Sequence, residues 1–149
     1  QVWDEFPILQ RQSDDLSGES RLALAVSEWN QKRSANALKT LEPFFRGAKD
    51  FENGEPALSL ALTVLIDAGQ WPQVADLYNK VEMWELTPET QRQLDYAMAL
   101  ASENMNKPEQ AATLWEALRQ RADLPLDQKA YMFYFLARGA ERKKDMETA

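Results

Sequence analysis

The sequence predicts an all-α domain of stacked helical pairs, and three observations predict it. A ten-residue pattern that begins at Gly69 recurs at Asn106, an offset of 37 residues (106 − 69). The 149 residues include only 5 glycines and few of the alternating β-branched runs that favour a sheet. Prolines stand where several helices are expected to begin, at positions whose N–H would be unpaired in any case. A step of this length is typical of repeated two-helix units that bury their apolar faces on one another.

The second helix of each expected unit carries the repeat most clearly. In each one a small residue is followed four positions later by a large residue, and three positions after that by an apolar one. The small residue allows two helices to approach closely, and the large residue fills the groove beside it. These sets are Ala37, Val74 and Ala111; Leu41, Tyr78 and Trp115; and Phe44, Val81 and Leu118.

Apolar periodicity and helix-start signals define the individual helices. Thr87, Pro88 and Glu89 combine a capping hydroxyl, a first-turn proline and a first-turn acid. Gly69 and Asn106 suit tight turns, because these residue types tolerate the left-handed backbone conformation, and Lys32 departs from that pattern. The expected helices span 17–31, 34–46, 56–68, 72–84, 88–104, 108–121 and 126–142, with a further helix beginning near Met146.

The same period sets the expected domain organisation. One repeat domain covers residues 17–149, in units of about 17–54, 55–87, 88–125 and a truncated 126–149. Residues 1–16 form an N-terminal segment, whose apolar side chains suit the tail of a preceding helical unit. The abrupt start and the half-finished last unit suggest a piece of a longer protein.

Composition argues against several classes of function. The net charge is −7, which disfavours a nucleic-acid partner, because phosphate binding requires clustered Lys and Arg. The basic residues Arg142, Lys143 and Lys144 are interpreted as a solvated helix end. Cysteine and histidine are absent, so the commonest nucleophile, general base and metal ligands are missing. No apolar run is long enough to span a membrane.

These absences predict a protein without catalytic activity, cofactor or metal. The adjacent acids Asp4/Glu5 and Asp14/Asp15 have no base or metal ligand at useful spacing, so they are interpreted as capping and solvating residues. No glycine-rich phosphate loop is present. The absence of cysteine fits an oxidising periplasm and the cytosol equally.

The small–large–apolar sets resemble those of the tetratricopeptide repeat family, over about residues 18–149. The resemblance implies a right-handed αα superhelix (a solenoid) of about three and a half units. The usual spacing in that family is about 34 residues, and the longer step here suggests extended inter-repeat loops. The early tryptophan of the family is replaced by Arg21, Leu58, Asp95 and Phe133, so the repeats are degenerate.

The family binds peptides on the concave side that its first helices line, which implies a partner-binding groove in this chain. Tyr and Arg are the residue types expected at binding hot spots. The alternative is that Trp29, Tyr96 and Tyr134 are core residues between helices. The implied groove residues are Leu22, Val26, Trp29, Thr63, Ile66, Gln93, Tyr96, Leu100, Tyr131, Tyr134 and Arg138.

The run from Tyr131 to Leu136 is apolar all round a helical turn, so more than one face of that helix should be buried. Exposure would forgo about 1.5–3 kcal/mol for each such side chain. We therefore expect self-association through this C-terminal helix, or a following repeat.

Two functions remain open at this point. One is an interaction module that binds a partner protein or peptide in the groove. The other is an assembly scaffold, as in the degenerate repeat arrays of bacterial polysaccharide export and outer-membrane assembly systems, an analogy that favours the periplasm as part of a larger cell-envelope protein.

Overall fold

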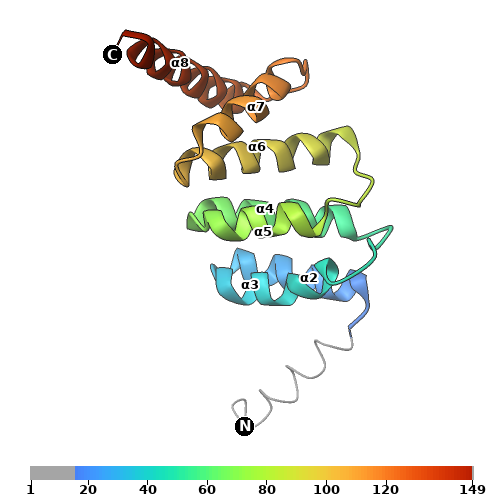
Figure 1. Ribbon diagram of the computed structural model, residues 1–149. Helices are drawn as coiled ribbons and strands as arrows, with labels where there is room; N and C mark the ends of the chain where they lie inside the picture. The colour runs from blue at the N-terminus through green and yellow to red at the C-terminus, as the bar shows by residue number, and fades with distance from the viewer. Residues whose placement is uncertain (1–15, 149) are drawn as a thin grey trace. The chain divides into compact units, whose positions relative to one another are not determined.

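The computed structural model describes residues 16–148, and within them the chain is entirely helical apart from loops and turns (Figure 1). The all-α prediction is confirmed. The chain divides into two compact units, residues 1–68 and 69–149. The expected tail of a preceding unit and the acid pairs Asp4/Glu5 and Asp14/Asp15 lie outside the described residues.

The first unit contains α2 (Gly18–Asn30), α3 (Ser34–Leu41), a short 3-10 helix η1 (Glu42–Phe45) and α4 (Gly54–Ala68). The single helix expected over 34–46 is wrong, because its α-helical part ends at Leu41. Pro43 has no N–H to donate, and its ring clashes with the carbonyl group four residues earlier. The chain therefore tightens into 3-10 geometry, which buries Phe44 and Phe45.

Helix α4 begins at Gly54, two residues earlier than expected, because Asp50 caps it. The Asp50 Oδ1 atom accepts hydrogen bonds from the backbone N–H groups of Glu52, at 3.0 Å, and Asn53, at 2.9 Å. Such side-chain bonds satisfy donors that a helix start leaves unpaired. The other Asp50 oxygen lies so close to Gly18 that a Cβ atom there would stand 2.4 Å from it. Only glycine leaves room for the cap at that point.

The core of the first unit forms between α2, α3, η1 and α4. Ala25, Ala37 and Leu41 are fully buried. The Thr40 Oγ1 atom donates a hydrogen bond of 2.5 Å to the Glu28 carboxylate, which links α3 to α2.

The second unit contains α5 (Trp71–Lys80), α6 (Pro88–Asn104), α7 (Pro108–Arg119) and α8 (Leu126–Thr148). The expected extension of α5 to Trp84 is wrong. The chain turns after Lys80 instead, and the N–H of Trp84 donates to the Val81 carbonyl at 2.9 Å. The starts of α3, α5 and α7, at residues 34, 71 and 108, are each 37 residues apart.

The turns within the three helical pairs share one backbone conformation. Among the described residues, positive φ angles occur at Lys32 (61°), Gly69 (65°) and Asn106 (59°), at the same 37-residue step. The N–H of Arg33 donates to the Glu28 carbonyl at 2.9 Å, and that of Lys107 donates to Ser102 at 2.8 Å. Lys32 therefore departs from the pattern in residue type but not in conformation.

The positions that define the repeat are buried, with one exception. The three small positions, Ala37, Val74 and Ala111, are fully buried, and so are Leu41 and Trp115 among the large ones. Tyr78 is only half-buried. Burial of its ring raises its pKa, with further contributions from Asp95 and Glu82. The three apolar positions that follow, Phe44, Val81 and Leu118, are buried as well.

Helix α8 is longer than expected and unbroken, because it runs from Leu126 to Thr148. The second helix expected near Met146 is therefore wrong. Residues 141–147 contain neither glycine nor proline and are mostly good helix formers, so nothing in them ends the helix. Arg142 lies well inside α8, and the interpretation of it as a helix end is wrong.

The connection between α7 and α8 is fixed on α6 by two arginines. The Arg92 Nη1 atom donates to the Asp123 carbonyl at 3.0 Å, and the Arg121 Nη2 atom donates to the Pro88 carbonyl at 2.6 Å. Arg121 also bonds the Asp123 carboxylate, which lowers the pKa of that group. These contacts join the connection to the start of α6.

Candidate partner-binding surface

Trp115 on α7 is the centre of the second unit. Its side chain is fully buried between α6 and α8. The Tyr96 ring of α6 meets it edge-on, with the ring centroids 5.8 Å apart and the planes at 71°. The Phe135 ring of α8 stacks on it at 5.5 Å and 9°. Both geometries are favourable for aromatic pairs, so one side chain holds three helices together.

A hydrogen bond and an ion pair extend this contact. The Trp115 Nε1 atom donates to Glu103 Oε1 on α6 at 3.3 Å. The other Glu103 oxygen lies 3.7 Å from the Arg142 Nη1 atom on α8. The side chain of Glu103 is 7% exposed, and a carboxylate at such a position requires partners of this kind. The buried indole N–H is satisfied in the same way.

The outer side of α8 carries exposed aromatic rings. Tyr131 and Tyr134 are 56% and 55% exposed. The Tyr134 ring meets Phe135 edge-on at 5.1 Å, and the Arg138 guanidinium lies 5.7 Å from the centroid of the Tyr134 ring. Ala130, Tyr131 and Tyr134 line a shallow hollow of about 270 Å³. Large aromatic side chains beside an arginine are the usual anchors of a protein interface.

The phenol of Tyr96 lies in a different environment. Burial, with smaller contributions from the neighbouring Asp127 and Tyr131, raises the pKa of Tyr96 to about 12. These neighbours show that the start of α8 faces the middle of α6. Tyr96 thus has one side on the core residue Trp115 and another towards the exposed end of α8.

We expect the stability of the protein to fall between pH 10 and pH 12 because of Tyr96. An unfolded tyrosine ionises near pH 10 and the folded one near 12, so over that range the unfolded state loses its proton first. Tyr96→Phe should flatten this part of the stability curve, as measured by urea unfolding at a series of pH values.

Asp127→Asn serves as the control for that titration. It keeps the Tyr96 phenol but removes a negative charge that raises the folded-state pKa, so the alkaline fall should still begin near pH 10 but end at a lower pH. An unchanged slope in Tyr96→Phe would contradict the assignment.

The residues expected in the groove divide between the two units. In the second unit, Gln93, Tyr96 and Leu100 lie on α6 and are half-buried, whereas Tyr131, Tyr134 and Arg138 lie on α8 and are exposed. The interpretation of Tyr134 as a core residue does not fit its exposure. In the first unit, Leu22 and Trp29 are half-buried, Val26 and Thr63 are exposed, and Ile66 is half-buried.

Several residues of this surface were not singled out by the sequence. Glu103 and Asp127 have no distinguishing motif, because acids are common on helices, and Phe135 stood out only as a member of the apolar run from Tyr131 to Leu136. Arg142 stood out only as part of a basic cluster.

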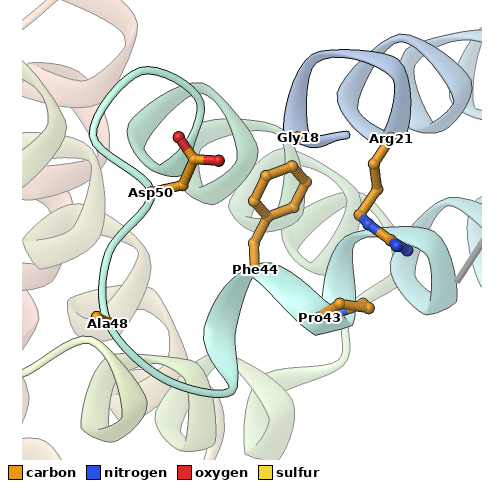
Figure 2. A pocket seen from close by; sticks show the side chains of 6 residues that line it. All are labelled: Gly18, Arg21, Pro43, Phe44, Ala48 and Asp50. Carbon is orange, nitrogen blue, oxygen red and sulfur yellow. The ribbon is translucent and has the colours of Figure 1, made fainter. Parts of the chain in front are cut away.

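A second hollow, of about 200 Å³, lies in the first unit (Figure 2). Figure 2 shows the Phe44 ring directed towards Gly18, with Arg21 on one side and Asp50 on the other. Arg21 is only 6% exposed. The Asp50 carboxylate is already used in capping α4. Two of the residues that line this hollow, Gly18 and Asp50, therefore belong to the cap of α4.

Two further properties bear on the chemistry of the chain. Among residues 16–148, no group of three or more acidic, histidine or cysteine side chains is placed to hold a metal ion. In the same part of the chain, no helix is both long and apolar enough to cross a membrane. No family model matches the chain, and no curated protein or solved structure matches it either, so its function has to be argued from its own geometry.

Proposed function

We propose that this chain is a non-catalytic interaction module with tetratricopeptide-like repeats, which binds a segment of a partner protein on the concave side of a right-handed superhelix. The repeated turns at Lys32, Gly69 and Asn106 support the repeat assignment. The partner segment docks on the side of α6 and α8 that carries Tyr96, Tyr131 and the other groove residues of the second unit.

The exposed pair Tyr131 and Tyr134 carries this proposal. Each of these two residues exposes more than half of its surface, on a helix that packs against the core through Phe135 and Met132. A rigid aromatic side chain buries a large area on binding and loses little conformational entropy. Arg138, stacked beside Tyr134, adds a donor group held in place before a partner arrives.

The proposal can be tested by selecting binders from a displayed peptide library on the immobilised chain. We expect a recurrent peptide pattern whose binding weakens at least tenfold in the double variant Tyr131→Ala/Tyr134→Ala. Phe51→Ala is the matched control, because it removes an aromatic ring that is 93% exposed in the other unit. Binders that tolerate the double variant as well as the control would contradict the proposed surface.

An assembly scaffold is the second candidate, and the exposed apolar residues of α8 favour it. Leu126 and Phe133 are 83% and 56% exposed, and Met146 is 80% exposed. Exposed apolar side chains on one helix are typical of a surface that another protein copy or repeat covers. Self-association in light scattering that is lost in Phe133→Ala would identify this function instead.

A further inference from the structure

Three residues of α6, spaced one helical turn apart, contact α7. The Tyr96 ring packs edge-on against Trp115. Ala99, one turn later, is fully buried in the same cluster, and its small side chain lets the two helices approach closely. Glu103, one turn further on, accepts the hydrogen bond from the Trp115 indole. Together these residues form a receiving set for a tryptophan on a neighbouring helix.

Helix α8 carries the same three residue types at the same spacing. Tyr134, Ala137 and Glu141 each follow their α6 counterparts by 38 residues (134 − 96, 137 − 99 and 141 − 103). The step is the 37-residue period plus one residue.

The buried sides of α6 and α8 confirm this register. Leu94 and Met98 of α6 are buried, and their counterparts in α8, Met132 and Leu136, are buried and half-buried. The two helices therefore turn corresponding sides towards the core of the unit. The receiving sets consequently lie on corresponding sides as well.

The two sets differ in that only the set on α6 is covered. Ala99 is fully buried beneath α7, whereas Ala137 is exposed. Tyr134 is 55% exposed, and Glu141 is also exposed. The apolar hollow beside Ala130 and Tyr134 lies one turn closer to the start of α8. Helix α8 thus presents an open receiving set with an apolar hollow next to it.

We propose that α8 docks an amphipathic helix of the partner protein, antiparallel to α8, whose sequence presents a small residue, a tryptophan four positions later and an apolar residue three positions after that. This inference rests on the proposed function and specifies the partner's chemistry. Helix α7 is the template, because Ala111, Trp115 and Leu118 have this spacing and α7 turns back along α6 after a three-residue connection.

Each partner residue has a defined place. The small residue passes over Ala137, where a larger one would hold the helices apart. The tryptophan ring meets Tyr134, and its N–H donates to the Glu141 carboxylate. In an antiparallel helix the third residue lies nearer the start of α8, where the hollow lined by Ala130, Tyr131 and Tyr134 receives it. An amphipathic helix that binds a protein surface is usually recognised by anchor side chains three and four residues apart, as these are.

The test uses a peptide with the sequence of residues 106–121 of this chain as the probe. Short helices are marginal in water, so Thr113 is changed to Lys and joined by a lactam bridge to Glu109; both side chains are exposed in α7. Fluorescence anisotropy with the full chain should show saturable binding. A control peptide that also carries Trp115→Ala should bind at least tenfold more weakly.

The matched protein variants are Ala137→Glu and Ala23→Glu. Both place the same charge at an exposed helical position, and only the first obstructs the receiving set. We expect Ala137→Glu to weaken binding of the probe at least tenfold and Ala23→Glu to leave it unchanged. Circular dichroism confirms that both variants remain folded.

The outcomes separate the inference from the proposed function. Absence of binding would overturn the receiving set on α8. Binding that Ala137→Glu leaves intact would overturn it too, because the probe would then displace α7 from α6. If displayed peptides without this pattern still depend on Tyr131 and Tyr134, the interaction module stands and only its partner class is wrong. If no peptide depends on these tyrosines, both fail.

Discussion

Trp115→Ala is expected to lower the free energy of unfolding by about 3–5 kcal/mol, the range for removing a large aromatic side chain from a core. The residue is fully buried and contacts Tyr96 and Phe135 with its ring. Its loss also leaves the nearly buried Glu103 carboxylate without the indole donor, and an unsatisfied buried acceptor adds to the cost. Equilibrium unfolding in guanidinium chloride, followed by circular dichroism, measures the change.

Trp115→Phe is the control for this prediction. A phenyl ring keeps part of the stacking on Phe135 but cannot donate to Glu103, so it should lose less stability than alanine does. A loss below about 1 kcal/mol in Trp115→Ala would be typical of a surface site, and would contradict the central place given to this side chain.

Leu41→Ala should destabilise the first unit by about 2–5 kcal/mol. Leu41 occupies the repeat position of Trp115 and is fully buried. Alanine would leave a cavity, because the surrounding helices close around such a site only in part. Urea unfolding of the full chain, followed by circular dichroism, measures this loss.

Tyr78→Ala is the comparison at the same repeat position. Tyr78 is half-buried, so less of its apolar surface returns to water, and its substitution should cost less than that of Leu41. Equal losses at the two positions would contradict the burial that the fold assigns to them.

The repeated part of the fold is predictable from sequence because its cause is local and recurs. Small and large residues at a 37-residue step identify the second helices, and turn-forming residue types at Gly69 and Asn106 locate the connections. At Lys32 the residue type does not indicate the turn that the structure has. The helices on both sides impose the left-handed turn, although lysine has no preference for it.

The errors concern helix ends, which depend on interactions distant in sequence or on a single residue. Asp50 starts α4 early through its side-chain oxygen. Pro43 ends α3 early through its ring. Helix α8 continues past Arg142, and its apolar periodicity could not reveal this because the last turns are polar.

The candidate site was predicted in part. The family resemblance assigned Tyr131, Tyr134 and Arg138 to the groove, and in the structure these side chains are exposed on α8. Tyr96 was assigned to the same surface, but it is half-buried and its ring packs against the core residue Trp115. Burial of this kind depends on which helix lies opposite, and a single helix does not encode its neighbour.

The docking role of α8 is tested most directly by the paired anisotropy titration of the bridged 106–121 peptide against Ala137→Glu and Ala23→Glu. We expect a dissociation constant at least tenfold higher for Ala137→Glu than for the unaltered chain, and an unchanged one for Ala23→Glu. Equal affinities for all three proteins would contradict it.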